Sequence, residues 1–249
     1  MGASLFHLDA ERLQALTAGQ RAVLDGDEGF HAATVQRIAV GESVLLADGQ
    51  GRLAHCVVRE VPAKDQVVVE VEAITVAPPP SPRVVVVQAL PKGDRGELAV
   101  EMLTEVGVDV IVPWAASRCI AQWKGEKEAR GVAKWRNAAV AAAKQSRRPR
   151  TPQVSDLAHT KDVLRLISET PNAWVLHEDG EVRLSAVNVP LQGDVLLVVG
   201  PEGGVSPEEL DAFAAAGAQV VRLGPTVLRT STAGTVAAGI VMSRTNRWA

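Results

Sequence analysis

The chain has 249 residues, of which 47% are hydrophobic and 22% are charged, as is typical of a soluble globular protein with one large or two modest cores. Its longest apolar runs, 84–87 and 195–199, are too short to cross a bilayer, and its first residues lack the basic-then-apolar pattern of a signal peptide. Two cysteines and five scattered histidines predict neither a disulfide framework nor a metal site. We therefore expect a cytoplasmic protein with no metal and no membrane partner.

The N-terminal part, residues 1–77, has the pattern of short strands. The segment 42–61 predicts a hairpin that turns at 48–51, and the alternating segment 65–74 predicts a further strand. The segment HAATVQRI, 31–38, predicts a short helix that ends near Gly41. Together these elements favour a small, mostly β barrel.

The segment PPPSP, 78–82, separates this part from the rest of the chain. Four prolines in five residues cannot continue a helix or the interior of a sheet, and they favour extended polyproline geometry. We therefore expect two domains, 1–77 and 83–249, joined by a proline-rich linker at 78–82.

In residues 83–249, apolar strands alternate with amphipathic helices. This alternation predicts an α/β domain with a mainly parallel sheet. The expected strands are 83–90, 109–114, 173–179, 194–200 and 218–224, and the expected helices are 93–108, 126–146, 160–169, 206–217 and 229–247.

Positive charge is concentrated in one segment of this α/β part. Between Arg118 and Arg150 there are ten Lys or Arg residues against two Glu, so this segment carries about +8 and the remainder of the chain about −11. Such a segment is typical of a solvated helix face or of a surface that binds a polyanion. Its end, KQSRRPR at 144–150, has four positive charges and no acidic residue to pair them, which favours polyanion binding.

A glycine-rich loop, Gly200–Gly204, lies between an apolar strand and a helix. The helix has a clear start, because Ser206 can cap it and Glu209 stands where a capping box requires it. Glu208 and Glu209 therefore have a structural explanation. Glu202 lies between the glycines, where it would repel a pyrophosphate. The loop is either a tight turn or a site for a positively charged ligand that approaches the backbone closely, such as S-adenosylmethionine.

A second strand, Gly-Pro turn and helix follow at 221–239, so two similar loops are expected at one edge of the sheet. Ligands of open α/β sheets bind at such edges. Arg229 stands at the start of the second helix, although cations prefer helix C-termini. Its position therefore favours a binding role over a structural one.

The segments GPEGGVSPEEL and LGPTVLRTSTA resemble the SPOUT superfamily of RNA methyltransferases, specifically the bacterial 16S rRNA (uracil-N(3))-methyltransferase family, the RsmE type. The segments 91–120 and 134–154 are similar to this family's opening strand and helix and to its long helix and basic turn. The segment 31–51 is similar to its N-terminal PUA-like domain. One residue departs from the family pattern, because Ser231 stands where the family commonly has Glu, so a catalytic role of that Glu cannot be transferred to this chain.

The resemblance implies a fold and partners that the periodicity alone does not predict. The implied fold is an α/β, mostly parallel, trefoil-knotted SPOUT domain preceded by a small PUA-like β-barrel. The implied cofactor is S-adenosylmethionine, and the implied partners are 16S ribosomal RNA or the small ribosomal subunit and a second copy of the chain. The cofactor contacts implied by motif match are Leu176, His177, Gly200, Pro201, Glu202, Gly203, Gly204, Leu223, Gly224, Leu228, Arg229 and Thr230.

The implied reaction is methylation of ring nitrogen 3 of a uridine. Arg229 could stabilise the uracil anion, and Glu202 could act as a base or hold the sulfonium, so both are candidate catalytic residues. Two alternatives remain at this point: another SPOUT methyltransferase acting on ribose 2′-O or on another base, or a non-enzymatic RNA-binding ribosome-assembly factor. The residues expected to bind RNA are Lys92, Arg95, Arg118, Lys144, Arg147, Arg148 and Arg150.

Overall fold

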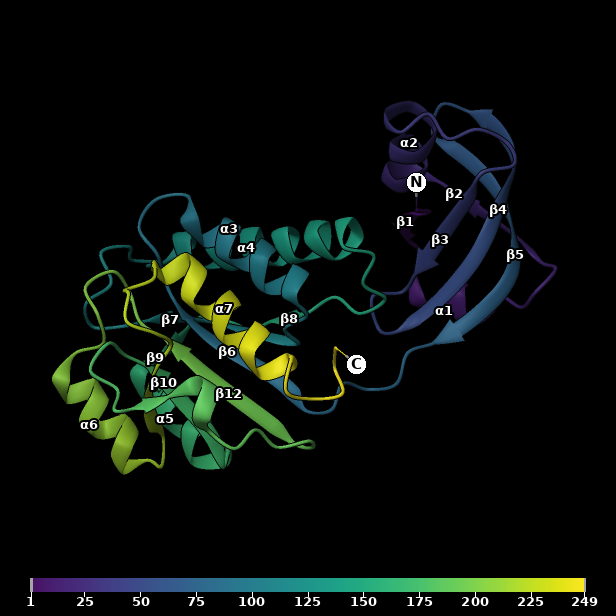
Figure 1. Cartoon of the computed structure of the whole chain (residues 1–249). Helices are drawn as coiled ribbons and strands as arrows, with labels where there is room; N and C mark the ends of the chain where they lie inside the picture. The colour runs from purple at the N-terminus through teal and green to yellow at the C-terminus, as the bar shows by residue number, and fades with distance from the viewer. Residues whose placement is uncertain (1, 249) are drawn as a thin grey trace. The chain divides into compact units, whose positions relative to one another are not determined.

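The computed structural model describes residues 2–248, and their contacts divide the chain into two compact units. The first unit contains the residues up to 79 together with 143–151 (Figure 1). The second contains residues 80–142 and the residues from 152 onward. The division falls within the proline-rich segment, but 143–151, which the sequence places in the C-terminal part, belongs by its contacts to the first unit.

The first unit is built on a five-stranded sheet in the order β1-β3-β4-β5-β2. Strands β3 and β4 form the predicted hairpin, and only the β1–β3 pair is parallel among the strand pairs described in this sheet. One face is buried, because alternate residues such as Leu46, Val58 and Val69 point into a common core. The strands are β1 Ser4–His7, β2 Arg21–Leu24, β3 Ser43–Ala47, β4 Arg52–Ala63 and β5 Gln66–Val76.

The helices of the first unit are short, and one differs from the prediction. The segment expected to form a helix at 31–38 is instead a helix that begins at Gly26 and continues into a π-helical turn ending at Val35. The sequence pattern missed this start because the first turn holds Gly26, Asp27 and Gly29, which are poor helix formers. The elements are α1 Ala10–Gln14, α2 Gly26–Phe30 and η1 His31–Val35.

The second unit has an eight-stranded sheet in which the strand pairs are parallel. The order is β11-β13-β10-β12-β6-β7-β8, and β9 also pairs with β7. Helices α3, α4 and α7 lie on one face of the sheet, and α5 and α6 on the other (Figure 1). The strands are β6 Arg83–Ala89, β7 Val110–Ala115, β8 Gln153–Val154, β9 Ala158–His159, β10 Asn172–Leu176, β11 Val182–Arg183, β12 Asp194–Val199 and β13 Gln219–Arg222.

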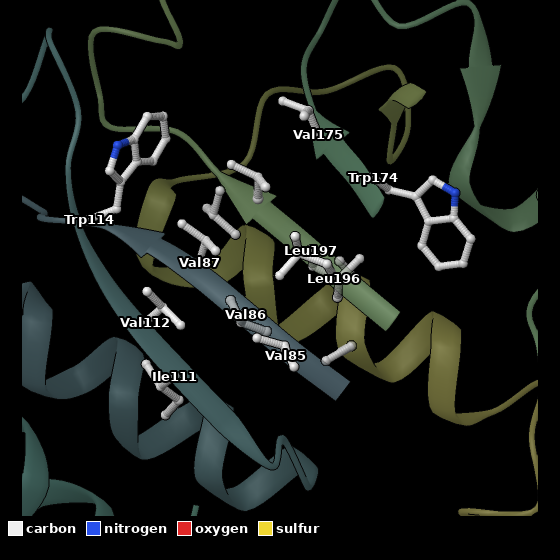
Figure 2. Close-up of a cluster of buried hydrophobic side chains, with 14 of the residues drawn as sticks. Val85, Val86, Val87, Ile111, Val112, Trp114, Trp174, Val175, Leu196 and Leu197 are labelled. Carbon is white, nitrogen blue, oxygen red and sulfur yellow. The ribbon is translucent and has the colours of Figure 1, made fainter. Parts of the chain in front are cut away.

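Burial on both faces explains the apolar runs of the central strands. In β6 and β12, consecutive residues such as Val86, Val87 and Leu197 are fully buried, which is typical of a parallel sheet covered by helices on both sides. Figure 2 shows these side chains between Trp114 and Trp174. The helices are α3 Arg95–Val106, α4 Glu126–Gln145, α5 Thr160–Glu169, α6 Pro207–Ala215 and α7 Thr230–Met242, with a short 3-10 turn, η2 Leu184–Ala186.

The predicted strands and helices of 83–249 are all present, with two differences. The last helix ends at Met242, and the residues after it form turns. Strands β8, β9 and β11 were not predicted, since each has only two residues and periodicity needs a longer segment. Within residues 2–248, none of the helices combines the length and apolar character needed to traverse a bilayer.

A buried ion pair fixes the end of the second unit to the start of its sheet. Arg247 donates to both carboxylate oxygens of Asp109, at 2.7 and 3.0 Å, and to the carbonyls of Pro82 and Gly107. Asp109 also accepts from the backbone N–H of Val84. The two side chains are only 16% and 8% exposed, so removing either one leaves the other charge buried.

We expect Arg247→Met to lower the free energy of unfolding by about 3–5 kcal/mol, the usual cost of an uncompensated buried charge. Urea denaturation measures this loss. Arg83→Met is the matched control, because the Arg83–Asp194 pair is much more exposed, at 48% and 35%, and should contribute at most about 1 kcal/mol. If both variants lose the same free energy of unfolding, the buried Arg247–Asp109 pair contributes no more than the exposed Arg83–Asp194 pair, and the prediction is wrong.

Candidate active site

A cavity of about 1020 Å³ lies at the carboxyl edge of the parallel sheet. Its walls come from the ends of β10 and β12, the start of α7 and the residues preceding α3. A smaller cavity of about 190 Å³ shares Leu176, His177 and Leu228 with it and extends to the loop after β13. Because parallel strands end at a common edge, loops far apart in the sequence meet here.

The structure brings the predicted cofactor residues to these two cavities. Those of the large cavity come from three loops, and those of the small one from the turn after β13. In the large cavity are Leu176, His177, Gly200, Pro201, Glu202, Gly203, Gly204, Leu228, Arg229 and Thr230, and in the small one are Leu223 and Gly224.

A chain of polar contacts fixes the start of α7 against the glycine loop. The hydroxyl of Thr230 donates to the carbonyl of Gly200, and the side-chain amide of Gln88 donates to the carbonyl of Ala89 and to Thr230. Gln88 is fully buried, and its Oε1 has no hydrogen-bond partner within residues 2–248. The position of Arg229, directly before Thr230, is therefore set by the interior of the domain.

Arg229 itself is free to bind a ligand. It is the N-cap residue of α7 but makes no side-chain capping bond, and within residues 2–248 its exposed guanidinium has no carboxylate or carbonyl partner. A cation at a helix N-terminus meets the positive end of the helix dipole, so no local interaction explains this residue. An anionic group in the cavity would satisfy it.

The carboxylate of Glu202 fixes a second loop. Its Oε1 accepts from the backbone N–H of Lys92 at 3.1 Å, which joins the glycine loop to the residues before α3. Arg118 donates to the carbonyl of Gly203 at 3.3 Å. A side chain at Gly203 would come within 3.2 Å of Arg118, so these two segments lie in close contact at this glycine.

Glu209 does more than cap its helix. It completes the predicted capping box with Ser206, but its carboxylate also accepts from the backbone N–H and the hydroxyl of Ser117, both at 2.9 Å, and from the hydroxyl of Thr160 at 2.8 Å. Burial raises the pKa of Glu209, but hydrogen bonds from Ser117, Thr160 and Ser206 outweigh it and keep the pKa below its ordinary value. The ionised group thus joins the loop after β7, the start of α5 and the start of α6.

The predicted RNA-binding residues fall into two groups. Lys92, Arg95 and Arg118 line the large cavity. The remaining four, in 144–150, belong to the first unit.

The expectation that 144–150 has no acidic partner is wrong. Lys144 Nζ lies 2.5 Å from Glu28 Oε1, and both side chains are mostly buried. Arg150 donates to the carbonyl of Ala77, and Arg147 donates to that of Gly2. Sequence reasoning missed Glu28 because it lies far away in the chain.

Helix α4 ends with a Schellman motif inside this basic run. The N–H of Arg147 bonds to the carbonyl of Lys144, and the N–H of Arg148 bonds to that of Ala143. Arg147 has a φ of 55°, the left-handed conformation that glycine usually supplies. The basic segment 144–150 therefore terminates helix α4, whether or not it also binds a ligand.

Several cavity residues were not predicted. Asp94, Leu98, Glu178 and Val227 line the large cavity, but nothing distinguishes them in the sequence. Gln88 could have been noticed, because it interrupts the buried run Val84–Ala89 with a polar side chain. Among residues 2–248, no group of three or more His, Cys, Asp or Glu could hold a metal ion.

Comparison with known proteins gives the class of protein first. Residues 78–242 match the family model of the RNA methyltransferase domain, and residues 24–72 match that of the RNA methyltransferase PUA domain. The fold and the site thus define an RNA methyltransferase: a SPOUT-type α/β domain with a mostly parallel sheet, preceded by a PUA-like domain, as predicted.

Curated relatives identify the particular family. A ribosomal RNA small subunit methyltransferase E from Mycobacterium bovis is 46% identical over 252 residues, which span 100% of this chain and 94% of the relative. The protein of the same name from Bacillus subtilis is 29% identical, with 84% of this chain and 85% of the relative covered. The chain belongs to the ribosomal RNA small subunit methyltransferase E family.

Two solved structures are similar over nearly the whole chain. A methyltransferase from Legionella pneumophila, in complex with the cofactor SAM, has a TM-score of 0.85 at 27% identity and covers 98% of this chain and 99% of its own. A ribosomal RNA small subunit methyltransferase E from Neisseria gonorrhoeae, bound to S-adenosylmethionine, has a TM-score of 0.84 at 26% identity. The match covers 97% of this chain and 98% of the Neisseria chain. The cofactor implied by the resemblance is thus present in both structural relatives.

We expect Glu209→Gln to lower the free energy of unfolding by about 3 kcal/mol, because the introduced NH₂ donor would face groups that are themselves donors. The loss should also depend on pH. The pKa of Glu209 in the folded state is depressed, so its stabilisation is present above about pH 4.3 and is lost as the pH falls through the folded pKa.

Urea denaturation from neutral to acidic pH measures both effects, and the Gln variant should lack this part of the acid dependence. Glu208→Gln is the matched control, because Glu208 lies on the same turn but is exposed. A Glu209→Gln protein as stable as the Glu208→Gln protein would show that the four hydrogen bonds contribute little.

Proposed function

We propose that this protein transfers a methyl group from S-adenosylmethionine to ring nitrogen 3 of a uridine in 16S ribosomal RNA. The observation that carries the proposal is the unpaired Arg229 in one cavity with Glu202 and the glycine loop. Membership of the ribosomal RNA small subunit methyltransferase E family supports an rRNA substrate, and the two SAM-bound structural relatives support the cofactor.

The residues of the two cavities fit this cofactor. Gly204 and Gly224 present bare backbone to the cavities, and a side chain added at either would meet no atom within 4 Å, so there is open space beside them. Glu202 supplies a negative charge, which suits a sulfonium. When bound, S-adenosylmethionine supplies an electrophilic methyl group, and Leu176, Leu223 and Leu228 offer apolar contacts for its uncharged parts.

Arg229 has the properties that the proposed reaction requires. Nitrogen 3 of uracil becomes nucleophilic when it loses its proton, and the resulting negative charge needs a donor. A planar guanidinium with no protein partner can donate two charge-assisted hydrogen bonds to that anion. Glu202, held toward the cavity by the Lys92 N–H, serves as the base or balances the sulfonium.

The proposed target also requires an RNA contact surface. Nitrogen 3 lies on the pairing edge of uracil, so the base must be unpaired or extruded before it can react. Lys92, Arg95 and Arg118 surround the cavity and can bind the phosphates beside the target base. Arg147 and Arg148 are proposed as further phosphate contacts, whereas Lys144 and Arg150 are held within the fold by Glu28 and by the carbonyl of Ala77.

We also propose that the chain forms a homodimer through its second unit. Leu98 of α3 and Val236 of α7 are 47% and 38% exposed, and these two helices pack against each other (Figure 1). Val227, at the rim of the cavities, is 79% exposed. Exposed apolar side chains on adjacent elements are typical of a protein interface.

Gly224→Val tests the cofactor site. The added side chain would project into open space beside the small cavity, and Gly224 has no positive φ, so the fold should be unaffected. Because the added methyl groups overfill the site, we expect the dissociation constant for S-adenosylmethionine to rise about tenfold or more. Calorimetric titration measures the affinity and thermal melting checks the fold. Wild-type affinity in the folded variant would exclude this site.

Arg229→Ala tests the catalytic role. The change should be neutral or slightly stabilising, because it removes a cation from a helix N-terminus. Single-turnover methylation should slow by roughly tenfold to a thousandfold, the cost of losing one donor to a developing anion. Arg229→Lys should recover part of the rate, since a point charge cannot replace a two-pronged donor.

Nucleoside mass spectrometry of the product distinguishes 3-methyluridine from a 2′-O-methylated or differently methylated nucleoside. An Arg229→Ala protein that melts much earlier but methylates normally per folded molecule would make this arginine structural. The absence of 3-methyluridine in the wild-type product would overturn the proposed reaction.

A further inference from the structure

A third hollow, distinct from the small cavity, lies beside the large cavity, and two indole rings form part of its wall. Its volume is about 140 Å³, and it shares Gly93 and Asp94 with the large cavity. Trp123 and Trp135 meet edge to face, with ring centroids 5.4 Å apart and an interplanar angle of 81°. The chain has only eight aromatic residues, so placing two of them beside the site is a strong local concentration.

Two helical glycines hold these rings in place. A side chain at Gly131 of α4 would come within 2.5 Å of the Trp123 ring, and one at Gly96 of α3 within 2.7 Å of Trp135 Nε1. Glycine inside a helix costs up to about 1 kcal/mol relative to alanine. In both helices a glycine stands at the position where an indole ring packs against the backbone. The two rings are therefore held close to α3 and α4.

The hollow offers two features that a flat ligand can use. Trp135 is 2% exposed, yet neither its indole N–H nor that of Trp123 has an acceptor within residues 2–248. By contrast, Trp114 donates to Thr160 at 3.4 Å. The Trp135 indole nitrogen is not enclosed by the fold, so a ligand can reach its N–H, and the ring of the half-buried Trp123 provides an aromatic surface.

Charges of both signs surround the hollow, because Asp94 and Glu97 line it together with Lys134. Lys134 lines it, is 69% exposed and makes only a long contact of 3.7 Å with Glu97. Lys124 and Lys127 are exposed on the same segment, and within residues 2–248 neither ammonium has a carboxylate partner. An aromatic ring with a hydrogen-bond acceptor, carried on a polyanion, is the chemistry of a nucleobase in single-stranded RNA.

We propose that this hollow receives the base of a nucleotide next to the one being methylated. The base stacks on Trp123, one of its carbonyl oxygens accepts from the N–H of Trp135, and Lys134 binds the adjoining phosphate. Extruding the target base leaves its neighbour without a stacking partner, and the shared residues Gly93 and Asp94 place the hollow directly beside the main cavity. This inference rests on the proposed function, because it assumes RNA in the large cavity.

The test compares Trp123→Leu and Trp135→Phe with Trp248→Leu, which removes a tryptophan that is 55% exposed and does not line the hollow. A short single-stranded oligouridylate with a fluorescent label serves as the probe, and the anisotropy of the label reports its binding to each variant. Loss of one base stack should weaken binding about five- to a hundredfold.

In methylation of small ribosomal subunits, Trp123→Leu should raise KM and leave kcat nearly unchanged, while affinity for S-adenosylmethionine stays at the wild-type value. Trp135→Phe keeps an aromatic ring but removes the indole N–H, so it should weaken binding of the oligonucleotide less than Trp123→Leu does.

Wild-type binding by a folded Trp123→Leu protein, or an equal loss in Trp248→Leu, would overturn the proposal. A loss seen with assembled subunits but not with the oligonucleotide would assign the hollow to a protein partner and overturn it as well. If the wild-type protein binds the oligonucleotide through Trp123 but forms no 3-methyluridine, the proposed reaction fails and the base-binding hollow stands.

Discussion

The arrangement of the site depends on the buried carboxylate of Glu209. Four donors from Ser117, Thr160 and Ser206 converge on its two oxygens, so it joins segments that no sheet ladder connects. Ser117 precedes a cavity arginine, and Ser206 follows the glycine loop. A carboxylate can accept from all four donors because it is ionised, whereas an amide or a hydroxyl cannot. The position of the cavity walls is thus tied to one buried charge.

A second set of contacts holds the backbone beside Arg229 and leaves the Arg229 side chain without a partner within the described residues. Gln88, Thr230 and Gly200 connect β6, the start of α7 and the glycine loop inside the domain. Because these buried groups hold the backbone on either side, Arg229 can remain unpaired at a helix N-terminus where its charge is locally unfavourable. The fold therefore offsets an electrostatic cost at the position where an anion is proposed to form.

Positive residues have different uses in the two units. In the second unit, Arg229, Lys124 and Lys127 have no carboxylate partner within the described residues, and Lys134 makes only a long contact with Glu97. In the first unit, Lys144 pairs with Glu28, and Arg150 binds a backbone carbonyl. Lys144 and Arg150 are partly buried, where a cation requires a partner within the fold, while the exposed Arg229, Lys124 and Lys127 keep their charge available to RNA.

The sequence by itself determined the main elements of the α/β part, the capping box of α6 and the two Gly-Pro loops, because periodicity, caps and turns are local properties. The family motif in these loops also identified the part of the cavity lining that these loops provide. Only the tertiary structure decided that Glu209 binds Ser117 and Thr160, that Glu28 neutralises Lys144, and that Trp123 and Trp135 lie beside the main cavity. These contacts join residues far apart in the chain, and their partners are selected by packing and burial, which no local pattern records.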